Sequence, residues 1–511
     1  MDPMTPPTTE RPRNVLVIMT DQHRVDTIGA LLAPGAKGVH TPNIDRLAAE
    51  GFAFTQAMTP TPICTPARTS LLTGAAPFRH KVLANHEWNI GYQTELDPSS
   101  WTYTQALRDA GYNVGLVGKY HVGEANPPSV FGMDDDSFEG ATNPVGNPRY
   151  TQWLADNGLP PVRITDAIRG TLPGNRPGHV LAGRLQQPLE ATFERFLTDI
   201  AIGKVREYAA EWHSNATPFC LHMHYFGPHL PYVIPDEYFD LIDPDDIELP
   251  ASFGETFLNK PPVQQNYSTY WSADSFDAAE WRKLIAIYRG YVAMIDLEVG
   301  RLLDALEEQG VREETSIFFT ADHGEFTGAH RLNDKGPAAY DDILNIPMLA
   351  HVPGVSHHGQ SDAFVSLLDV PATIMELAGL DQSLVVDGRS LLHLAWDAQT
   401  EPWRRDIVTE FHGHHFPLQQ RVLITPEWKL VVSPESVNEL YDRVNDTNEL
   451  VNRHGDPDVD DVRKRLATCL HTILADRGDK AFANWMLATT DFDVPMTAIS
   501  HQDYDAVEGN D

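Results

Sequence analysis

The sequence predicts an α/β fold in which helices cover a sheet of parallel strands, followed by a smaller C-terminal antiparallel sheet and a helix. Short apolar runs that end in a polar or charged residue recur up to about residue 400, and helix-like sequence follows each of them. Runs that are apolar on both faces are typical of parallel strands buried between helices. Beyond that point, shorter strand candidates alternate with turn residues, which favours antiparallel pairing. The 511 residues correspond to two or three domains at roughly 150 residues each.

Four apolar runs are predicted as strands of the main sheet, and each leads to a polar side chain. Ligands of parallel sheets bind outside the carboxyl ends of the strands. The polar residues are therefore expected to meet at one edge of the sheet, although each taken singly is more simply a turn that ends a strand. The strands cover residues 14–20, 114–118, 219–226 and 315–320, and they lead to Asp21, Lys119, His229 and the pair Asp322-His323.

A long amphipathic helix is predicted over residues 281–310, because its apolar residues recur every three or four positions. Gly310 is the expected C-cap. The C-terminal unit is predicted to contain strands over 406–411, 421–425, 428–432 and 438–442 and a helix over 462–474.

These patterns divide the chain into a large α/β domain over 13–400, an α+β subdomain over 401–480 and a tail over 481–511. The tail is acidic and lacks clear periodicity, so it is either disordered or an arm that packs on a neighbouring subunit. Its apolar content is poorly suited to a free solvated tail, which favours packing, including packing within a homo-oligomer (a dimer or a tetramer). The apolar residues are Phe482, Trp485, Met486, Leu487, Phe492 and Val494.

Composition and charge exclude several classes of protein. The chain has 38 Lys and Arg against 72 Asp and Glu, a net charge of −34. Such a surface repels phosphate backbones and anionic lipids, which argues against nucleic-acid and membrane partners. No apolar run approaches the roughly 20 residues of a spanning helix, and the N-terminus has no apolar segment typical of a secretory signal. With only three scattered cysteines, a cytoplasmic enzyme is the expectation.

The sharpest local motif is Cys64-x-Pro66-x-Arg68, within the stretch Pro62 to Gly74. Pro66 stands where a helix can begin, since its missing N–H is not needed there. Residue 64 would then lie at the positive end of a helix beside a guanidinium, which favours anion binding. The alternative is a buried structural cysteine that precedes a helix.

Extended into Thr-Ser-Leu-Leu-Thr-Gly74, this motif resembles the signature of the type I sulfatases of the alkaline phosphatase superfamily. The resemblance covers most of residues 13–475. It implies a large, mixed but mostly parallel sheet sandwiched by helices, and oxidation of Cys64 to Cα-formylglycine by a separate formylglycine-generating enzyme. The other similar segments, in the family's order, are 14–22 with 41–51, 118–123, 227–231, 320–325 with Lys335, and 439–442.

The resemblance also implies one divalent metal ion. Asp21, Gln22, Asp322 and His323 fall on the family's ligand positions, with Cys64 as a further ligand. Many sulfatases have Asp-Asp and Asp-Asn at these pairs, whereas Gln22 and His323 are similar to the phosphonate monoester hydrolases and to some sulfatases. Oxygen ligands suit Ca²⁺, which is the first expectation, and the imidazole admits Mn²⁺, which is the second.

Residue roles are implied in the same way. A hydroxyl of the hydrated aldehyde at residue 64 would attack sulfur, while His229, with Lys335, assists the leaving oxygen. His121 would take the proton of the second hydroxyl, so that sulfate is eliminated and the aldehyde returns. Arg68, Lys119 and Lys335 would stabilise the oxyanions.

Asn85 resembles a substrate contact of the phosphonate monoester hydrolase branch, although that branch lacks the pair Lys119 and His121. The leading hypothesis is therefore a hydrolase of small aryl or alkyl sulfate monoesters. The alternative is a phosphonate monoester or phosphodiester hydrolase, and side activity between these classes is expected because each presents one negative charge. A third hypothesis is a non-catalytic binding protein. His412, His414 and His415 are further candidates for the substrate pocket.

Overall fold

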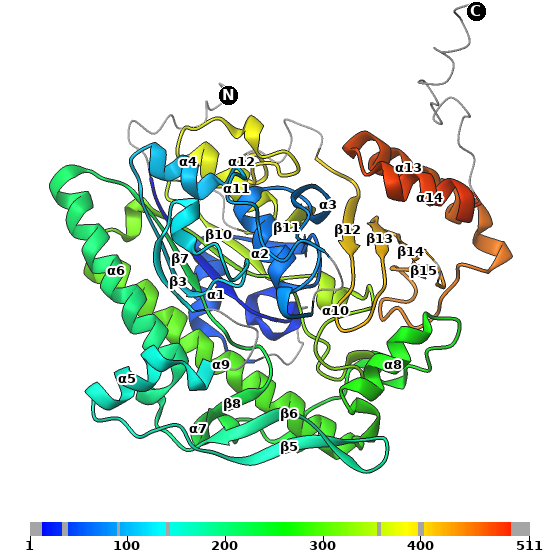
Figure 1. Ribbon diagram of the computed structural model, residues 1–511, viewed down its shortest axis with the longest axis horizontal. Coiled ribbons are helices and arrows are strands. Elements are labelled where there is room, and N and C mark those ends of the chain that lie inside the picture. Colours follow the sequence, from blue (N-terminus) through cyan, green and yellow to red (C-terminus); the bar gives the residue numbers. More distant parts are fainter. Residues whose placement is uncertain are drawn as a thin grey trace, which may run out of the picture.

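The fold is described from a computed structural model, which covers residues 13–32, 39–88, 92–138, 144–354, 359–396, 403–434 and 436–491. Its centre is an eight-stranded sheet in the order β11-β2-β10-β9-β1-β7-β3-β4, in which only β10 runs antiparallel to its neighbours (Figure 1). The mixed, mostly parallel sheet predicted from the sequence is thus confirmed. The strands are β1 Asn14–Thr20, β2 Phe52–Met58, β3 Asn113–Lys119, β4 Asp134–Phe138, β7 Phe219–His224, β9 Thr315–Ala321, β10 Met348–His351 and β11 Gly359–Ser366.

Alternating side chains of β1 explain why helices cover both faces of this sheet. Leu16 and Ile18 pack with α1, α6 and α9 on one face, whereas Val15 and Val17 pack with α2, α4 and α11 on the other. Successive side chains of a strand point to opposite faces, so an uninterrupted apolar run requires a helical layer on each side. The helices are α1 Pro42–Glu50, α2 Cys64–Thr73, α4 Tyr103–Asp109, α6 Phe193–Asn215, α9 Ala278–Glu308 and α11 Asp369–Leu377.

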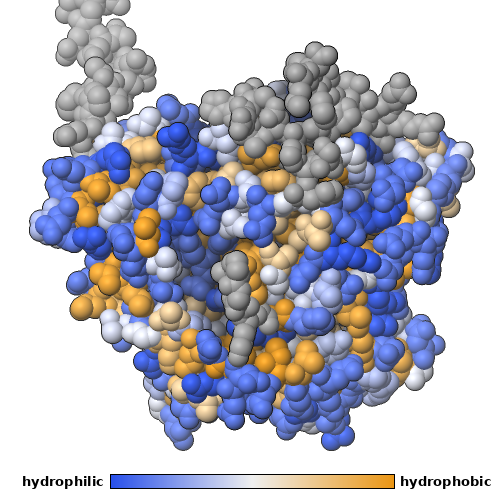
Figure 2. Space-filling model, turned by 180° about the vertical axis from the view of Figure 1, so that it is seen from behind, coloured by the Kyte–Doolittle hydropathy of each residue, from blue (hydrophilic) through white to orange (hydrophobic). Residues whose placement is uncertain are grey.

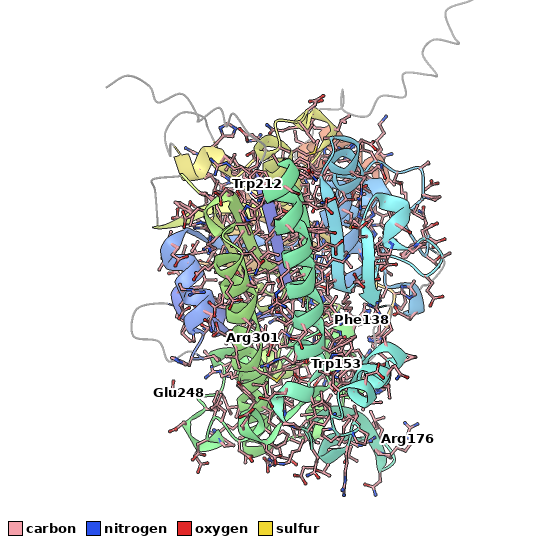
Figure 3. The ribbon with its side chains drawn as sticks, turned by 90° about the vertical axis from the view of Figure 1, so that its left-hand side faces the viewer. Phe138, Trp153, Arg176, Trp212, Glu248 and Arg301 are labelled. Atoms are coloured by element: carbon pink, nitrogen blue, oxygen red, sulfur yellow. The ribbon has the colours of Figure 1, made fainter. Side chains whose placement is uncertain are left out.

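The long helix α9 begins three residues before the prediction because of its cap. Asp277 accepts hydrogen bonds from the N–H groups of Ala279 and Glu280, while the Glu280 carboxylate accepts from the N–H of Asp277. This capping box satisfies N–H groups that the first helical turn leaves unpaired. Figure 3 shows α9 beside α6 over the sheet, with Arg301 and Trp212 on the two helices.

A third, three-stranded sheet was not predicted. The strands β5 Ile164–Leu172 and β6 Arg176–Leu185 form a hairpin, and β8 Tyr232–Pro235 pairs with β6 in parallel. Most residues of β5 are exposed or half-buried, so neither an apolar run nor a clear alternation marks this strand in the sequence. The remaining helices are α3 Pro77–His80, α5 Pro148–Asp156, α7 Asp236–Phe239, α8 Pro262–Tyr270, α10 Asp341–Leu344 and α12 Leu392–Trp396.

The C-terminal unit has the predicted antiparallel sheet and helix. Its strands are β12 Ile407–Phe411, β13 Gln420–Ile424, β14 Trp428–Val432 and β15 Glu439–Asp442, paired in that order, and α13 Asp460–Arg477 covers one face. The other face packs toward the eight-stranded sheet through Val422, Val431 and Tyr441.

The first part of the predicted tail is a helix that packs on the C-terminal unit. Lys480–Thr489 form a helix, α14, whose Phe482 and Met486 are buried against α13 and the small sheet of the same chain. Phe492 and Val494 lie outside the described residues. Packing of this segment on another subunit stays a prediction.

No helix among the described residues is long and apolar enough to span a membrane. Hydrophilic side chains cover most of the face drawn in Figure 2, and its apolar residues lie in small groups.

Candidate active site

The carboxyl ends of β1 and β9 bring the predicted metal ligands together. The two strands pair in parallel with Thr20 opposite Ala321, so Asp21 and Asp322, the next residues, lie side by side. Cys64 is the first residue of α2, whose start faces the same edge. All of these side chains are fully buried, as are Gln22 and His323.

Four of the predicted ligands form one cluster of donor atoms. The Sγ of Cys64 lies 3.1 Å from Nε2 of His323 and 3.8 Å from Oδ1 of Asp21. Donor atoms of Asp21, Cys64, Asp322 and His323 all lie within 4.8 Å of one another. Ligands that share one ion at about 2.0–2.6 Å are separated by distances of this order.

The orientation of His323 fits metal binding. Its Nδ1–H donates a hydrogen bond of 2.8 Å to the carbonyl oxygen of Gly324. That hydrogen bond leaves the lone pair of Nε2 directed at the cluster, as is usual for a metal-ligating imidazole. Two carboxylates and an imidazole therefore suit one divalent ion.

Gln22 lies beside this cluster, but its amide contacts other groups. Its Nε2 donates to Oδ1 of Asp334 at 3.0 Å and to Glu325, and its Oε1 accepts from Nζ of Lys335 at 3.3 Å. Its N–H donates to Oδ1 of Asp322. The amide thus links the metal cluster to Lys335, and its own role as a ligand stays a prediction.

Three buried cations surround the cluster. Arg68 binds both carboxylates, with Nη2 at 2.7 Å from Oδ2 of Asp21 and Nε at 3.0 Å from Oδ2 of Asp322. Nζ of Lys119 lies 2.7 Å from Oδ2 of Asp21, and Nζ of Lys335 lies 3.2 Å from Oδ1 of Asp334. The site thus has the positive charge needed to hold an anionic group.

These cations favour the ionised forms of Cys64 and Asp21, but they do not outweigh burial at Asp322. Burial raises the pKa of the Cys64 thiol, but the charges of Lys119 and Lys335 hold it well below its ordinary value. For Asp21, burial and Cys64 raise the pKa, and Lys119, His229 and Arg68 outweigh them and lower it. Burial and the charge of Asp21 raise the pKa of Asp322 to about 6.

His229 and Lys335 form a pair on one side of the cluster. Nζ of Lys335 lies 2.8 Å from Nε2 of His229, while Nδ1 of His229 bonds to the carbonyl oxygen of Leu230. Since an ammonium can only donate, Nε2 accepts and the proton of the neutral imidazole is on Nδ1. Burial and the charge of Lys335 lower the pKa of His229 to about 4.

Asn85 supports the start of α2. Its Oδ1 accepts a hydrogen bond of 2.9 Å from the N–H of Thr65, the residue that follows Cys64. The side chain is buried. Contact with substrate stays a prediction for this residue.

Sequence reasoning missed Asp334 and Glu87. The Oδ2 of Asp334 accepts from the Tyr267 hydroxyl at 2.6 Å and lies 3.8 Å from Nε2 of His414. Glu87 binds His121. The signal for Asp334 was its position next to Lys335, whereas nothing in the sequence distinguished Glu87 from other acidic loop residues.

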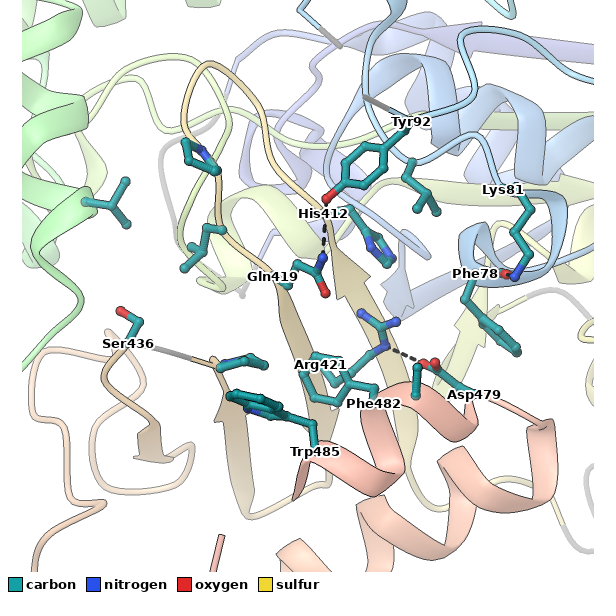
Figure 4. Close-up of a pocket in the computed structure, with 16 residues that line it drawn as sticks. Phe78, Lys81, Tyr92, His412, Gln419, Arg421, Ser436, Asp479, Phe482 and Trp485 are labelled. Carbon is teal, nitrogen blue, oxygen red and sulfur yellow. Dashed lines mark hydrogen bonds and ion pairs between the residues drawn. The ribbon is translucent and has the colours of Figure 1, made fainter. Parts of the chain in front are cut away.

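The loop between β12 and β13 lies between the metal cluster and a cavity. His414 faces Asp334, but His412 bonds to Oε2 of Glu410 at 2.6 Å and lines a cavity of about 700 Å³ (Figure 4). Gln419 in the same loop donates to the Tyr92 hydroxyl. Of the three candidate histidines of this loop, His412 therefore belongs to the cavity rather than to the metal cluster.

A mixed sheet with this buried cluster at its carboxyl edge is the architecture of the alkaline phosphatase superfamily. The model of the family described as Sulfatase matches residues 13–380, so the chain belongs to the sulfatase family. A second model, described as the C-terminal region of N-sulphoglucosamine sulphohydrolase, matches residues 328–476. The resemblance noted in the sequence is thereby confirmed.

Individual relatives come from both branches that the sequence suggested. The chain is 30% identical to the uncharacterized sulfatase YidJ of Escherichia coli strain K12, over 91% of this chain and 87% of that protein. It is also 30% identical to the multifunctional alkaline phosphatase superfamily protein PehA of Trinickia caryophylli, over 78% and 80%. The crystal structure of a phosphonate monoester hydrolase of Agrobacterium radiobacter superposes with a TM-score of 0.74 at 25% identity, over 91% and 96%.

Proposed function

We propose that the protein hydrolyses a small aryl or alkyl sulfate monoester, with formylglycine derived from Cys64 as the nucleophile. The observation that carries the proposal is the position of Cys64. Its sulfur lies in one buried cluster with Asp21, Asp322 and His323, and three cations surround that cluster. A buried cysteine with a purely structural role needs neither metal donors nor cations around it.

The side chains divide the reaction between them. Arg68, Lys119 and Lys335 would bind the oxygens of the transferring group and stabilise the charge that develops on them. When bound, the divalent ion would supply Lewis acidity toward the ester and favour the ionised nucleophile.

The leaving oxygen needs a proton, and the proposed donor is the ammonium of Lys335. Because Nε2 of His229 accepts from the ammonium of Lys335, this pair can deliver a proton from Nζ while His229 orients the donor. His121 would act in the second half of the reaction, when sulfate leaves residue 64. Its proposed task is to take the proton of the second hydroxyl as the C–O bond to sulfate breaks and the aldehyde forms again.

A phosphonate monoester or phosphodiester hydrolase is the alternative. Gln22, His323 and Asn85 favour it, as does the likeness to the phosphonate monoester hydrolase structure. Lys119 and His121 favour the sulfatase, because elimination of sulfate requires a base. We give the second pair more weight, since Gln22 and His323 alter only the surroundings of the metal.

Two measurements test the proposal. Intact mass spectrometry should find the protein about 18 Da lighter than its sequence after expression with a formylglycine-generating enzyme. A panel of sulfate, phosphonate and phosphodiester esters should give the highest kcat/KM for a sulfate monoester, with measurable activity on the other classes. Faster turnover of a phosphonate or phosphodiester than of every sulfate ester would establish the alternative.

A further inference from the structure

The imidazole of His121 is hydrogen-bonded through Nε2 to the carboxylate of Glu87. Nε2 of His121 lies 2.9 Å from Oε1 and 3.1 Å from Oε2 of Glu87. The His121 side chain is fully buried, whereas that of Glu87 is 26% exposed. The two residues come from different segments, the turn after β3 and the short helix at His86–Trp88.

The opposite nitrogen of the ring has no such partner. Nδ1 of His121 is buried and forms no hydrogen bond with any residue in the described part of the chain. His121 also contacts Cys64. A carboxylate accepts and never donates when ionised, so Glu87 places the ring proton on Nε2 and leaves the lone pair on Nδ1.

A second imidazole helps to define the geometry. The rings of His86 and His121 meet edge to face, with centroids 5.0 Å apart. Nε2 of His86 lies 3.4 Å from both Glu87 and Glu124. Glu87 is therefore closer to His121 than to His86. Glu124 contacts only the ring of His86 among these two imidazoles.

From this arrangement we infer that Glu87 is a positioning residue, which fixes the orientation and tautomer of His121 so that Nδ1 faces residue 64 as a base. The inference rests on the proposed function and adds a residue to it. In the release step, Nδ1 takes the proton of the second hydroxyl, the O–H electrons form the carbonyl bond, and the electrons of the breaking C–O bond leave with sulfate. Glu87 changes neither its bonds nor its charge.

The kinetic test separates the two halves of the reaction. After rapid mixing with 4-nitrophenyl sulfate, Glu87→Gln should release a first equivalent of nitrophenol at close to the wild-type rate. Its steady-state rate should fall by about 10- to 100-fold, the usual cost of removing an orienting partner, and kcat should fall more than KM changes. Glu124→Gln is the matched control, since it removes the same charge beside His86, and its rates should match the wild type.

A spectroscopic test does not depend on turnover. In the Cys64→Ala variant, which has no thiolate beside the ring, ¹⁵N-labelled histidine should show His121 protonated on Nε2 and unprotonated on Nδ1 at about pH 8.5; His121→Gln assigns the signal. Glu87→Gln should shift this ring toward a mixture of tautomers.

The inference would be overturned by a proton on Nδ1 of His121 while Glu87 is present, by an unchanged release rate in Glu87→Gln, or by an equal loss in Glu124→Gln. A metal ion bound in one-to-one ratio and lost in Glu87→Gln alone would also do so, because Glu87 would then be a ligand. Failure of the proposed function is a separate result, visible as wild-type protein that hydrolyses no sulfate ester while the tautomer is as expected.

Discussion

At the scale of single residues, the site consists of charges that are stable only together. Asp21 contacts two cations, and Arg68 in turn contacts two carboxylates. Removing one partner of such a buried set leaves the others uncompensated, which is far more costly than losing a surface ion pair. Function rather than packing therefore dictates these residues.

Cys64→Ala should abolish multiple turnover, because alanine cannot supply the nucleophile. The change removes one sulfur atom at the start of a helix, so we expect the free energy of unfolding to change by less than about 2 kcal/mol. Urea unfolding together with an ester assay checks both expectations. Retained multiple turnover in this variant would contradict the formylglycine mechanism.

Asp21→Ala should lose both the metal ion and activity. It also leaves Lys119 without its carboxylate, so a destabilisation of about 3–5 kcal/mol is expected. Elemental analysis of the purified variant measures the metal. Asp97→Asn, a change at a surface turn, serves as the control and should bind the metal ion fully. Full metal occupancy in Asp21→Ala would show that the ligands are assigned wrongly.

At the scale of elements, the sequence predicted what apolar runs can specify. The runs of β1, β7 and β9 and the periodicity of α9 are visible because burial on both faces, or on one helical stripe, constrains every position. The exposed hairpin β5–β6 has no such constraint. Among site residues, Asp21 and Asp322 follow buried strands and were predictable, whereas the contact between Glu87 and His121 depends on the path of a loop.

The helix pair α6–α9 contains a buried acid that should make stability depend on pH. Burial raises the pKa of Glu194 to about 7, and the Tyr291 hydroxyl of α9 donates to its carboxylate. The unfolded chain loses this proton near the ordinary pKa of 4.5, so ionisation disfavours the folded state. Stability should therefore fall as the pH rises from about 4.5 to about 7.

Glu194→Gln should remove this contribution and flatten the pH dependence by up to about 3 kcal/mol between pH 5 and pH 8. Urea unfolding at several pH values measures the effect. Glu207→Gln on the exposed side of α6 is the control, and its pH dependence should match the wild type. If Glu194→Gln keeps the full wild-type pH dependence of the free energy of unfolding, ionisation of Glu194 does not destabilise the folded state.

At the scale of the whole molecule, α14 lines a cavity between the C-terminal unit and the catalytic domain. Asp479, just before α14, forms an ion pair of 2.7 Å with Arg421 on β13, and Phe482 lies under the guanidinium (Figure 4). The same residues line the cavity that the β12–β13 loop separates from the active site. The helix thus shapes a wall of that cavity as well as covering the small sheet.

Met486→Ala tests whether α14 packs on its own chain. Met486 is fully buried in the core shared with α13, and a Met-to-Ala change in such a core costs about 2–5 kcal/mol. The loss should appear in urea unfolding at every protein concentration, with an unchanged sedimentation mass, because the contacts are within one subunit. Thr489→Ala, at the exposed end of the helix, should cost less than about 0.5 kcal/mol. If the destabilisation of Met486→Ala instead grows as the protein is diluted, the helix contributes to an interface between subunits and the arm predicted from the sequence gains support.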